Sequence, residues 1–263
     1  MAKVYAIINQ KGGVAKTTTT FNMGAEIANR GYKVLLIDMD PQGTLTESMG
    51  FKKNLLDKTV DGLISPLTLK KPIPEVSEYI LKRKNLDLIP ANIALSTAEL
   101  LLVQATSREY VFKKVINKIK ETYDYDYILI DCPPTLGMLV VNILTAANSI
   151  IVPIAATEIE TPGFADLIET VKYQKMETNP DLYIEGVLMT KFNNRLKESK
   201  KALNIVTEIC EQYGIVIFDA KIKHGTVAPQ AYGERKTINE YAGNSEVAKN
   251  YRDFVTEVLN AEQ

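Results

Sequence analysis

Residues 10–18 combine two glycines, two lysines and two threonines at the junction of two regular elements. They read Gln-Lys-Gly-Gly-Val-Ala-Lys-Thr-Thr, after an apolar run at residues 4–8 and before a helical pattern that begins near Lys16. Glycines at such a junction let several backbone N–H groups point at one anion, and the positive end of the helix dipole adds to their effect. We therefore predict a phosphate-binding loop in which Lys16 reaches the terminal phosphates and the Thr17 hydroxyl holds Mg²⁺.

This loop departs from the standard pattern G-x-x-x-x-G-K-[ST]. Gln10 and Ala15 occupy the two glycine positions of that pattern, and Lys11 is an additional lysine. A glycine turn that merely joins a strand to a helix is the alternative interpretation. Two further segments argue against the alternative, because each ends an apolar run with aspartate.

The two further segments are residues 34–43 and residues 127–134, which end their apolar runs with Asp38, Asp40 and Asp131. Carboxylates at the ends of buried strands suit phosphoryl transfer, in which Mg²⁺ bridges the β- and γ-phosphates. We expect Asp131 to hold Mg²⁺ through water and Asp40 to orient the attacking water. Asp38 would lie behind the metal, hydrogen-bonded to its water shell. Each aspartate alone is also typical of a turn, but the three segments together favour a nucleotide site.

Apolar runs that alternate with amphipathic helices predict the fold that must position these residues. The runs lie at residues 4–8, 34–37, 86–89, 128–130, 150–154 and 186–189. Several lack polar alternation, as expected for parallel strands that are covered on both faces. We predict an α/β fold over residues 1–263 as a single domain. Its sheet would be doubly wound and mostly parallel, with helices on both faces and ligands at the carboxyl ends of the strands.

Two segments show clear helical periodicity. In residues 107–123, Val111, Val115 and Ile119 share one face. Roughly residues 245–260 carry an apolar stripe made of Val247, Tyr251, Phe254, Val255, Val258 and Leu259. Residues 52–84, which are rich in lysine and contain several prolines, are interpreted as an exposed excursion from the sheet.

Composition argues against several classes of function. With 31 basic and 32 acidic residues the net charge is −1, so no global field attracts a polyanion. Cys132 and Cys210 lack the spacing of a metal site or disulfide, which argues against an iron–sulfur reductase and favours a reduced cytoplasm. The one histidine, His224, cannot complete a catalytic triad alone. No apolar run approaches the roughly 18 residues that a membrane-spanning helix needs.

The three motifs resemble those of the deviant Walker ATPases of the ParA type, a family that includes chromosome and plasmid partition proteins. Residues 11–18 resemble its phosphate loop, residues 38–43 its second signature and residues 130–134 its third. The likeness extends through residues 190–193 and 228–229 to the last helix, so it covers nearly the whole chain. The nucleotide contacts that it implies are Lys11, Gly12, Gly13, Val14, Ala15, Lys16, Thr17, Thr18, Thr190, Lys191 and Pro229.

The resemblance implies that two subunits close face to face around two ATP molecules, with Lys11 reaching the partner's nucleotide. A cation supplied in trans neutralises phosphate charge only in the assembled dimer. ATP would therefore control formation of the homodimer, and hydrolysis would release it. The implied catalytic residues are Lys11, Lys16 and Asp40, and the implied Mg²⁺ site comprises Thr17, Asp38 and Asp131.

The resemblance also implies mobile switch regions at Gly43 and residues 133–137, and adenine contacts from residues 190–193 and 222–229. Family members usually have glycine where this chain has Ala15. If that position requires a positive φ, alanine adds strain of roughly 1–2 kcal/mol. We predict that ATP binding survives, weakened at most.

Partition requires DNA binding, which here must come from local basic patches. The candidate DNA contacts are Arg195, Lys197, Lys200, Lys201, Lys223, Lys249 and Arg252. A solvated helix face is an equally good interpretation of any single cluster. However, a two-fold dimer presents each patch twice, and affinity rises as phosphate contacts accumulate. Nothing resembles a base-reading helix, so we expect binding to non-specific duplex DNA in the ATP state.

Other functions remain open: a MinD-like ATPase on a membrane, an ATP-dependent ligase or kinase, and positioning of a protein cargo. The stripe on the last helix serves core packing equally well, and the end of this helix is not basic as a membrane anchor would be. No separate group of residues would bind an acceptor substrate. We therefore expect a cytoplasmic, nucleoid-associated ATPase without membrane binding. Its slow hydrolysis would be stimulated by a ParB-like centromere-binding protein.

Overall fold

The computed structural model describes residues 2–157 and 161–261, which form a seven-stranded sheet in the order β3-β4-β2-β5-β1-β6-β7. Only the β3–β4 pair is antiparallel within these residues. The α/β fold with a mostly parallel sheet is thereby confirmed. The strands are β1 (Lys3–Ile7), β2 (Val34–Asp38), β3 (Leu81–Arg83), β4 (Leu86–Ile89), β5 (Tyr127–Asp131), β6 (Ser149–Ala155) and β7 (Tyr183–Thr190).

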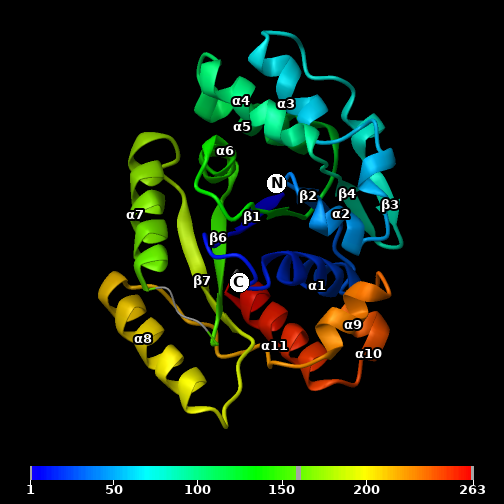
Figure 1. The fold of residues 1–263 in the computed structure, drawn as a ribbon. Coiled ribbons are helices and arrows are strands. Elements are labelled where there is room, and N and C mark those ends of the chain that lie inside the picture. The colour runs from blue at the N-terminus through cyan, green and yellow to red at the C-terminus, as the bar shows by residue number, and fades with distance from the viewer. Residues whose placement is uncertain (1, 158–160, 262–263) are drawn as a thin grey trace.

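Helices cover both faces of the sheet (Figure 1). One face packs against α1 (Lys16–Asn29), α2 (Thr44–Ser48), α9 (Val227–Gly233), α10 (Ile238–Ala242) and α11 (Glu246–Asn260). The other packs against α3 (Asp61–Thr68), α4 (Ala94–Gln104), α5 (Val111–Thr122), α6 (Met138–Ala146), α7 (Thr161–Glu177) and α8 (Lys197–Tyr213). Three short 3₁₀ helices are η1 (Lys53–Leu55), η2 (Val76–Tyr79) and η3 (Arg108–Tyr110).

Alternate residues of the strands supply the two apolar layers of the core. In β1, Val4 and Ala6 belong to the layer under α3–α8, whereas Tyr5 and Ile7 belong to the layer under α1 and α11. Side chains of successive strand residues point to opposite faces, so a strand that is apolar throughout fits only between two covered faces. The lack of polar alternation in the sequence has this physical cause.

The parallel register brings the three predicted motifs to one edge of the sheet. β5 lies between β1 and β2, and its last residue, Asp131, is opposite both Ile7 and Asp38. Because parallel strands end at the same edge, the loop after β1 and the turn after β2 both begin beside Asp131. This carboxyl edge is where the candidate site lies.

All six predicted strands are confirmed, with ends that lie at most three residues from the predicted ones. Interpretation of residues 52–84 as an exposed excursion holds only in part, because Leu63 and Val76 are buried in the core and residues 81–83 form β3. β3 is short, it lies at the edge of the sheet, and its central residue is the exposed Lys82. A strand with these properties contains no apolar run that would predict it from the sequence.

The apolar stripe of the last helix packs in the core. Phe254 and Val255 of α11 are fully buried, and the Tyr251 hydroxyl lies 3.3 Å from the Thr19 hydroxyl of α1. The stripe therefore belongs to the protein interior. Across residues 2–157 and 161–261, no helix has both the length and the apolar character needed to cross a membrane.

Candidate nucleotide-binding site

The loop between β1 and α1 contains two residues in the left-handed region, Gly13 at φ +75° and Ala15 at φ +71°. Position 15 thus has the positive φ that glycine adopts freely and that costs alanine roughly 1–2 kcal/mol. The condition for strain at Ala15 is met. The first turn of α1 nevertheless closes normally, because the Thr19 N–H donates to the Ala15 carbonyl over 2.9 Å.

Neighbouring strands hold both ends of this loop. The Asn9 side-chain amide donates to the Pro153 carbonyl over 2.8 Å, and the Lys11 N–H donates to Asn9 Oδ1 over 2.9 Å. The Thr190 hydroxyl at the end of β7 donates to the Val14 carbonyl over 3.0 Å, and Thr190 is fully buried. The structure therefore gives Thr190, a predicted nucleotide contact, the role of a buried support for the loop.

The ammonium group of Lys16 lies inside the loop. The side chain is buried, and Nζ donates to the Lys11 carbonyl over 3.1 Å. Burial lowers the pKa of Lys16, whereas the nearby Asp131, Cys132 and Asp40 act in the opposite direction. The amine is thus positioned at the phosphate loop and within the electrostatic field of two predicted site carboxylates.

Two threonine hydroxyls of α1 hold the Asp131 carboxylate. Thr17 Oγ1 donates to Asp131 Oδ2 over 2.7 Å, and Thr20 Oγ1 donates to Oδ1 over 3.3 Å. Burial raises the pKa of the fully buried Asp131, and Asp38 raises it further, while Thr17 and Lys16 oppose the shift. Thr20 was not predicted, although its spacing from Thr17 places both hydroxyls on one face of the helix.

The donor chemistry of Thr17 and Asp131 fits Mg²⁺. Mg²⁺ prefers oxygen ligands, and it usually takes one or two protein side chains together with phosphates and several waters. In the described residues, no cluster of three or more His, Cys, Asp or Glu side chains could hold a metal. The Thr17 hydroxyl and the Asp131 carboxylate are oxygen donors of the kind that Mg²⁺ prefers.

The glycines and Gln10 fit an anion at the same loop. A Cβ atom added at Gly12 or Gly13 would meet no atom within 4 Å, so the loop opens onto free space there. Gln10 Nε2 is buried and has no hydrogen-bond partner in the described part of the chain. Since buried donors are nearly always satisfied, a phosphate oxygen is a suitable partner for this amide.

The turn after β2, residues 38–43, is called the Asp40 turn here. Asp38 is fully buried, and Oδ1 accepts the Asp40 N–H over 3.2 Å. Its Oδ2 accepts the Thr46 hydroxyl over 2.7 Å. Burial raises the pKa of Asp38 to about 6, against the opposing effect of these hydrogen bonds.

Asp40 is partly exposed, and its Oδ1 accepts the Gln42 N–H over 2.8 Å. Asp40 is therefore the carboxylate of this turn that a ligand can reach.

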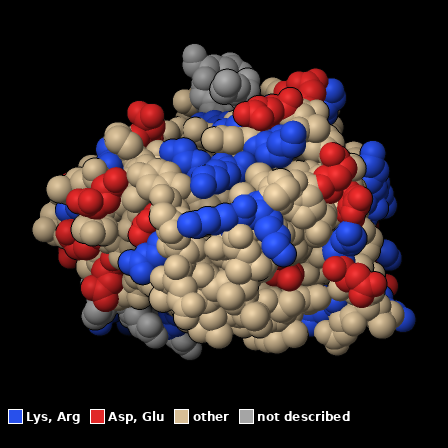
Figure 2. Space-filling model, turned by 90° about the horizontal axis from the view of Figure 1, so that it is seen from above, with Lys and Arg blue, Asp and Glu red and all other residues tan. Residues whose placement is uncertain are grey.

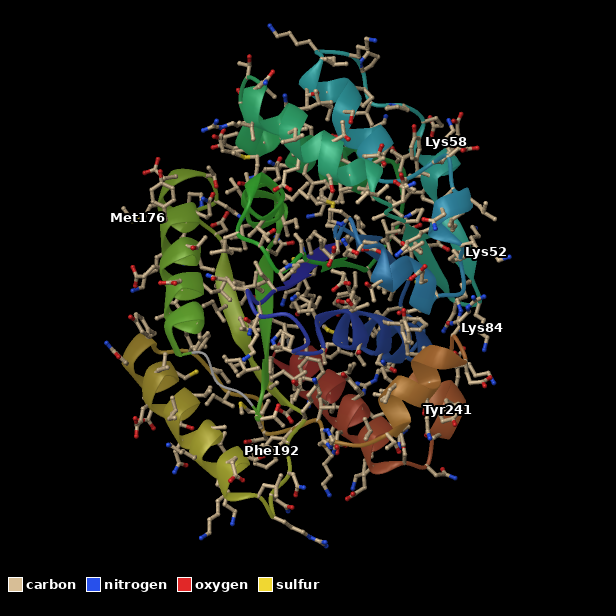
Figure 3. The ribbon with its side chains drawn as sticks, viewed as in Figure 1. Lys52, Lys58, Lys84, Met176, Phe192 and Tyr241 are labelled. Atoms are coloured by element: carbon tan, nitrogen blue, oxygen red, sulfur yellow. The ribbon has the colours of Figure 1, made fainter. Side chains whose placement is uncertain are left out.

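The two segments predicted to contact adenine lie side by side. Phe192 donates its N–H to the Ile222 carbonyl and accepts the His224 N–H at its own carbonyl, both over 2.9 Å. Figure 3 labels Phe192 where the chain leaves β7, between α8 and α11. Lys191 has φ +49° and is partly buried, and Pro229 is exposed at the start of α9.

The predicted DNA contacts are here called the α8–α11 basic surface, and three of them converge. Arg195, Lys223 and Lys249 all act to lower the pKa of Glu246, with the hydrogen-bonded Lys223 having the largest effect. Arg195 and Lys223 also line a hollow of about 370 Å³ together with Glu246. This convergence of positive charge around a single carboxylate is a feature that the sequence does not reveal.

The other members of the α8–α11 basic surface differ in exposure. Lys197, Lys200 and Lys201 are exposed on α8. Arg252 of α11 is partly buried and donates to Asn239 Oδ1 and to the Gly243 carbonyl, each over 2.9 Å. The structure thus gives Arg252 an internal role, while the three lysines of α8 face solvent.

A second group of basic side chains lies on the opposite side of the molecule. Figure 2 views the side of α3–α5 from above and shows Lys and Arg gathered across its middle, with acidic residues toward the margins. The helix α5, which packs on the α3–α8 face of the sheet, carries Lys113, Lys114, Lys118 and Lys120. Basic residues are therefore not confined to the α8–α11 basic surface.

Known proteins resemble this chain over nearly its full length. A profile described as an AAA domain matches residues 2–184. The sporulation initiation inhibitor protein Soj of Bacillus subtilis is 37% identical over 98% of both chains. The chromosome partitioning protein ParA of Caulobacter vibrioides is 32% identical over 99% of this chain and 95% of that protein. This chain belongs to the ParA/Soj family of ATPases.

A solved structure shares the fold of this ParA/Soj family member. The cobyrinic acid a,c-diamide synthase of Mycobacterium smegmatis is 33% identical, with a TM-score of 0.83 over 98% of this chain and 95% of that chain. Its crystal structures contain an ATP analogue with magnesium in one case and ADP with magnesium in another. Nucleotide with magnesium is therefore bound by a protein of the same architecture.

Proposed function

We propose that this chain is an Mg²⁺-dependent ATPase that dimerises on ATP and partitions plasmid or chromosomal DNA. The observation that carries the proposal is the meeting of Lys16, Thr17 and Asp131 beside the Asp40 turn. This constellation lies in a chain that resembles Soj and ParA over nearly its full length. The Caulobacter relative is named as a chromosome partitioning protein, and this is the process that we propose.

In this proposal the phosphate loop holds the triphosphate. Lys16 and the backbone N–H groups of residues 11–17 would bind its oxygens, and Gln10 Nε2 would gain a partner. Thr17 and, through water, Asp131 would hold Mg²⁺, which neutralises charge on the β- and γ-phosphates when bound. Support comes from the buried amine of Lys16 and from the short hydrogen bond between Thr17 and Asp131.

Asp40 would orient the attacking water. It is the partly exposed carboxylate of its turn, whereas both oxygens of Asp38 already accept hydrogen bonds. Asp38 would remain behind the metal, because its Oδ1 accepts the Asp40 N–H with one lone pair and keeps the other for a water of the metal shell. Lys11 would act in trans on the partner's nucleotide.

In the ATP dimer, the α8–α11 basic surface would bind the DNA backbone without reading bases. Arg195, Lys223 and Lys249 are the leading contacts because they converge around Glu246. Two copies in a two-fold dimer would double the number of phosphate contacts and steepen the salt dependence. A ParB-like partner would stimulate hydrolysis and so reset the dimer.

A ligase is the second candidate, and the similarity to a diamide synthase favours it. Both candidates use the same nucleotide site, so ATP hydrolysis alone does not distinguish them. They differ in the third component: duplex DNA for the partition ATPase and a small carboxylic acid for the ligase. Nucleotide-dependent DNA binding is therefore the decisive property.

The experiment measures binding to non-specific duplex DNA with ATP and with ADP, using the parent chain and Asp40→Ala to hold the dimer. Tight, salt-sensitive binding with ATP alone is expected. DNA affinity that is independent of nucleotide would contradict coupling between the two sites. Absence of DNA binding in both states would contradict partition and leave a scaffold-positioning ATPase or the ligase.

A further inference from the structure

Thr46 is a fully buried threonine next to the Asp40 turn. It belongs to α2, which begins directly after Gly43. The Thr46 hydroxyl donates to Asp38 Oδ2 over 2.7 Å, and its backbone N–H donates to the same oxygen over 2.9 Å. Ala91, which follows β4, donates its N–H to the Thr46 hydroxyl over 3.0 Å. One hydroxyl therefore connects the ends of two strands to α2.

The remaining oxygen of Asp38 reaches Asp40. Asp38 Oδ1 accepts the Asp40 N–H over 3.2 Å, and Asp40 in turn accepts N–H groups from Gln42 and Gly43, each over 2.8 Å. Because Thr46 holds Oδ2 with two hydrogen bonds, the Asp38 carboxylate cannot rotate without breaking them. Oδ1 consequently stays directed at the Asp40 backbone, and the turn that carries Asp40 is fixed from within.

We propose that Thr46 is a positioning residue for ATP hydrolysis, whose hydroxyl holds Asp40 in place through Asp38. This inference rests on the proposed function, in which Asp40 orients the attacking water. Water attack depends steeply on geometry, since a displacement of about 1 Å can cost about 100-fold in rate. Thr46 lies beneath the turn, so it acts on the reaction only through the two aspartates.

Thr46 and Thr17 hold their aspartates in different settings. Thr17 is partly exposed at the phosphate loop, and the Asp131 carboxylate that it contacts is a proposed metal site. Thr46 has no exposed surface, and its hydroxyl has a backbone donor and a carboxylate acceptor within the protein. Loss of the Thr46 hydroxyl therefore changes the position of a site residue while leaving the nucleotide contacts intact.

Thr46→Val tests the inference because it keeps the shape of the side chain and removes the hydroxyl. It also leaves the Ala91 N–H without its partner, which lowers stability. Thr145→Val is the matched control: Thr145 of α6 is equally buried, and its hydroxyl donates to the Val141 carbonyl over 2.8 Å. Both variants lose a buried hydroxyl, but only one of these hydroxyls contacts the Asp40 turn.

The measurements are kcat and KM for Mg²⁺-ATP hydrolysis, ATP Kd by titration, and the melting temperature of each full-length chain. Thr46→Val is expected to lower kcat about tenfold and to leave ATP Kd within about twofold. Thr46→Ser keeps the hydroxyl and should restore kcat to within about threefold of the parent value. Thr145→Val should melt earlier at an unchanged kcat. If Thr46→Val does not fold, Thr46→Cys replaces it, with a weaker donor and a kcat below that of Thr46→Ser.

Several outcomes overturn the inference. An unchanged kcat in Thr46→Val, beside a strongly impaired Asp40→Ala, removes the role of Thr46 and leaves the proposed function standing. An equal loss of kcat in Thr145→Val identifies a general effect of stability. A weaker ATP affinity at unchanged kcat would make Thr46 a determinant of binding. Normal hydrolysis by Asp40→Ala, or no hydrolysis by the parent chain, overturns the proposed role of Asp40 together with this inference.

Discussion

The carboxyl edge of the sheet and the α8–α11 basic surface differ in how their charged groups are held. At the edge, Asp131 and Asp38 are fully buried, and each accepts hydrogen bonds at both oxygens. On the basic surface, the three lysines of α8 are exposed, and Lys223 has an ion pair with a solvent-exposed carboxylate. The carboxylates at the edge are therefore fixed by hydrogen bonds inside the fold, whereas most charged groups of the basic surface face solvent.

This difference decides how much one side chain contributes. A buried charge that is fixed by hydrogen bonds acts at full strength in a low dielectric, and it cannot be replaced by a neighbour. Exposed charges are screened by salt, and each phosphate contact adds a similar increment. Substitutions at the carboxyl edge should therefore be severe one at a time. Substitutions on the basic surface should be mild and cumulative.

Asp40→Ala should have the largest effect. If Asp40 orients the attacking water, its loss should lower kcat about 1000-fold while ATP binding persists. The ATP dimer should then remain assembled, which size-exclusion chromatography with ATP would detect. Hydrolysis at the parent rate would assign the water-orienting role to another group and break the contrast between the two regions.

Lys16→Ala should come next. Removal of a charge-assisted contact to the phosphates should weaken ATP binding about 100-fold, or roughly 3 kcal/mol. Lys120→Ala is the matched control, because burial also lowers the pKa of Lys120 and its helix, α5, lies on the other side of the sheet. Titration with a fluorescent ATP analogue would measure both. Equal affinity losses in the two variants would indicate a general effect of removing a partly buried lysine.

The largest effects are expected at residues that the sequence alone identifies as site residues. The phosphate loop and the Asp40 turn were predictable because glycine, lysine and aspartate lie at fixed short spacings beside strand ends. The hydrogen bonds of Thr46 with Ala91 and of Thr190 with Val14 join residues 45 and 176 positions apart. Such contacts depend on strand order and register, which short spacings along the sequence do not predict.

The basic surface also shows what the sequence does not predict. Its lysines and arginines form clusters along the chain, but the fold separates them by exposure. It directs the Arg252 guanidinium into the protein and brings Arg195 beside Lys223, which the sequence places 28 positions later. A cluster of charges in the sequence does not tell where the side chains point, because a solvated helix face and a binding face have the same composition.

The double variant Arg195→Ala/Lys223→Ala should weaken DNA binding in the ATP state about tenfold and reduce the salt slope by about 2 per subunit. Lys114→Ala/Lys118→Ala, which removes two charges from α5, is the matched control and should leave the slope within about 0.5 of the parent value. Fluorescence anisotropy with labelled duplex over a salt series would measure both. A larger loss in the α5 variant would move the DNA site to the face seen in Figure 2.

Arg252→Ala should separate stability from DNA binding. Its guanidinium donates to two acceptors inside the protein, so its loss should destabilise the fold by about 1–2 kcal/mol. DNA affinity should stay within about twofold, because phosphate contacts come from the exposed members of the surface. Thermal melting and anisotropy on the same sample would test the two expectations. A tenfold loss of DNA affinity at unchanged stability would return Arg252 to the DNA site.

Ala15→Gly should have the smallest effect, although it lies in the phosphate loop. Ala15 has φ +71° at the start of α1, and we expect the loop to keep this backbone when ATP binds, so that its strain is common to the free and bound states. Relief of roughly 1–2 kcal/mol of strain is offset by the 0.5–1 kcal/mol entropic cost of glycine, so the net gain in stability should be about 1 kcal/mol or less. ATP Kd should change by less than about threefold, because relief that is common to free and bound states cancels in the affinity. A gain of about 100-fold in affinity would instead mean that the bound loop demands a backbone that alanine resists far more strongly than the one seen here.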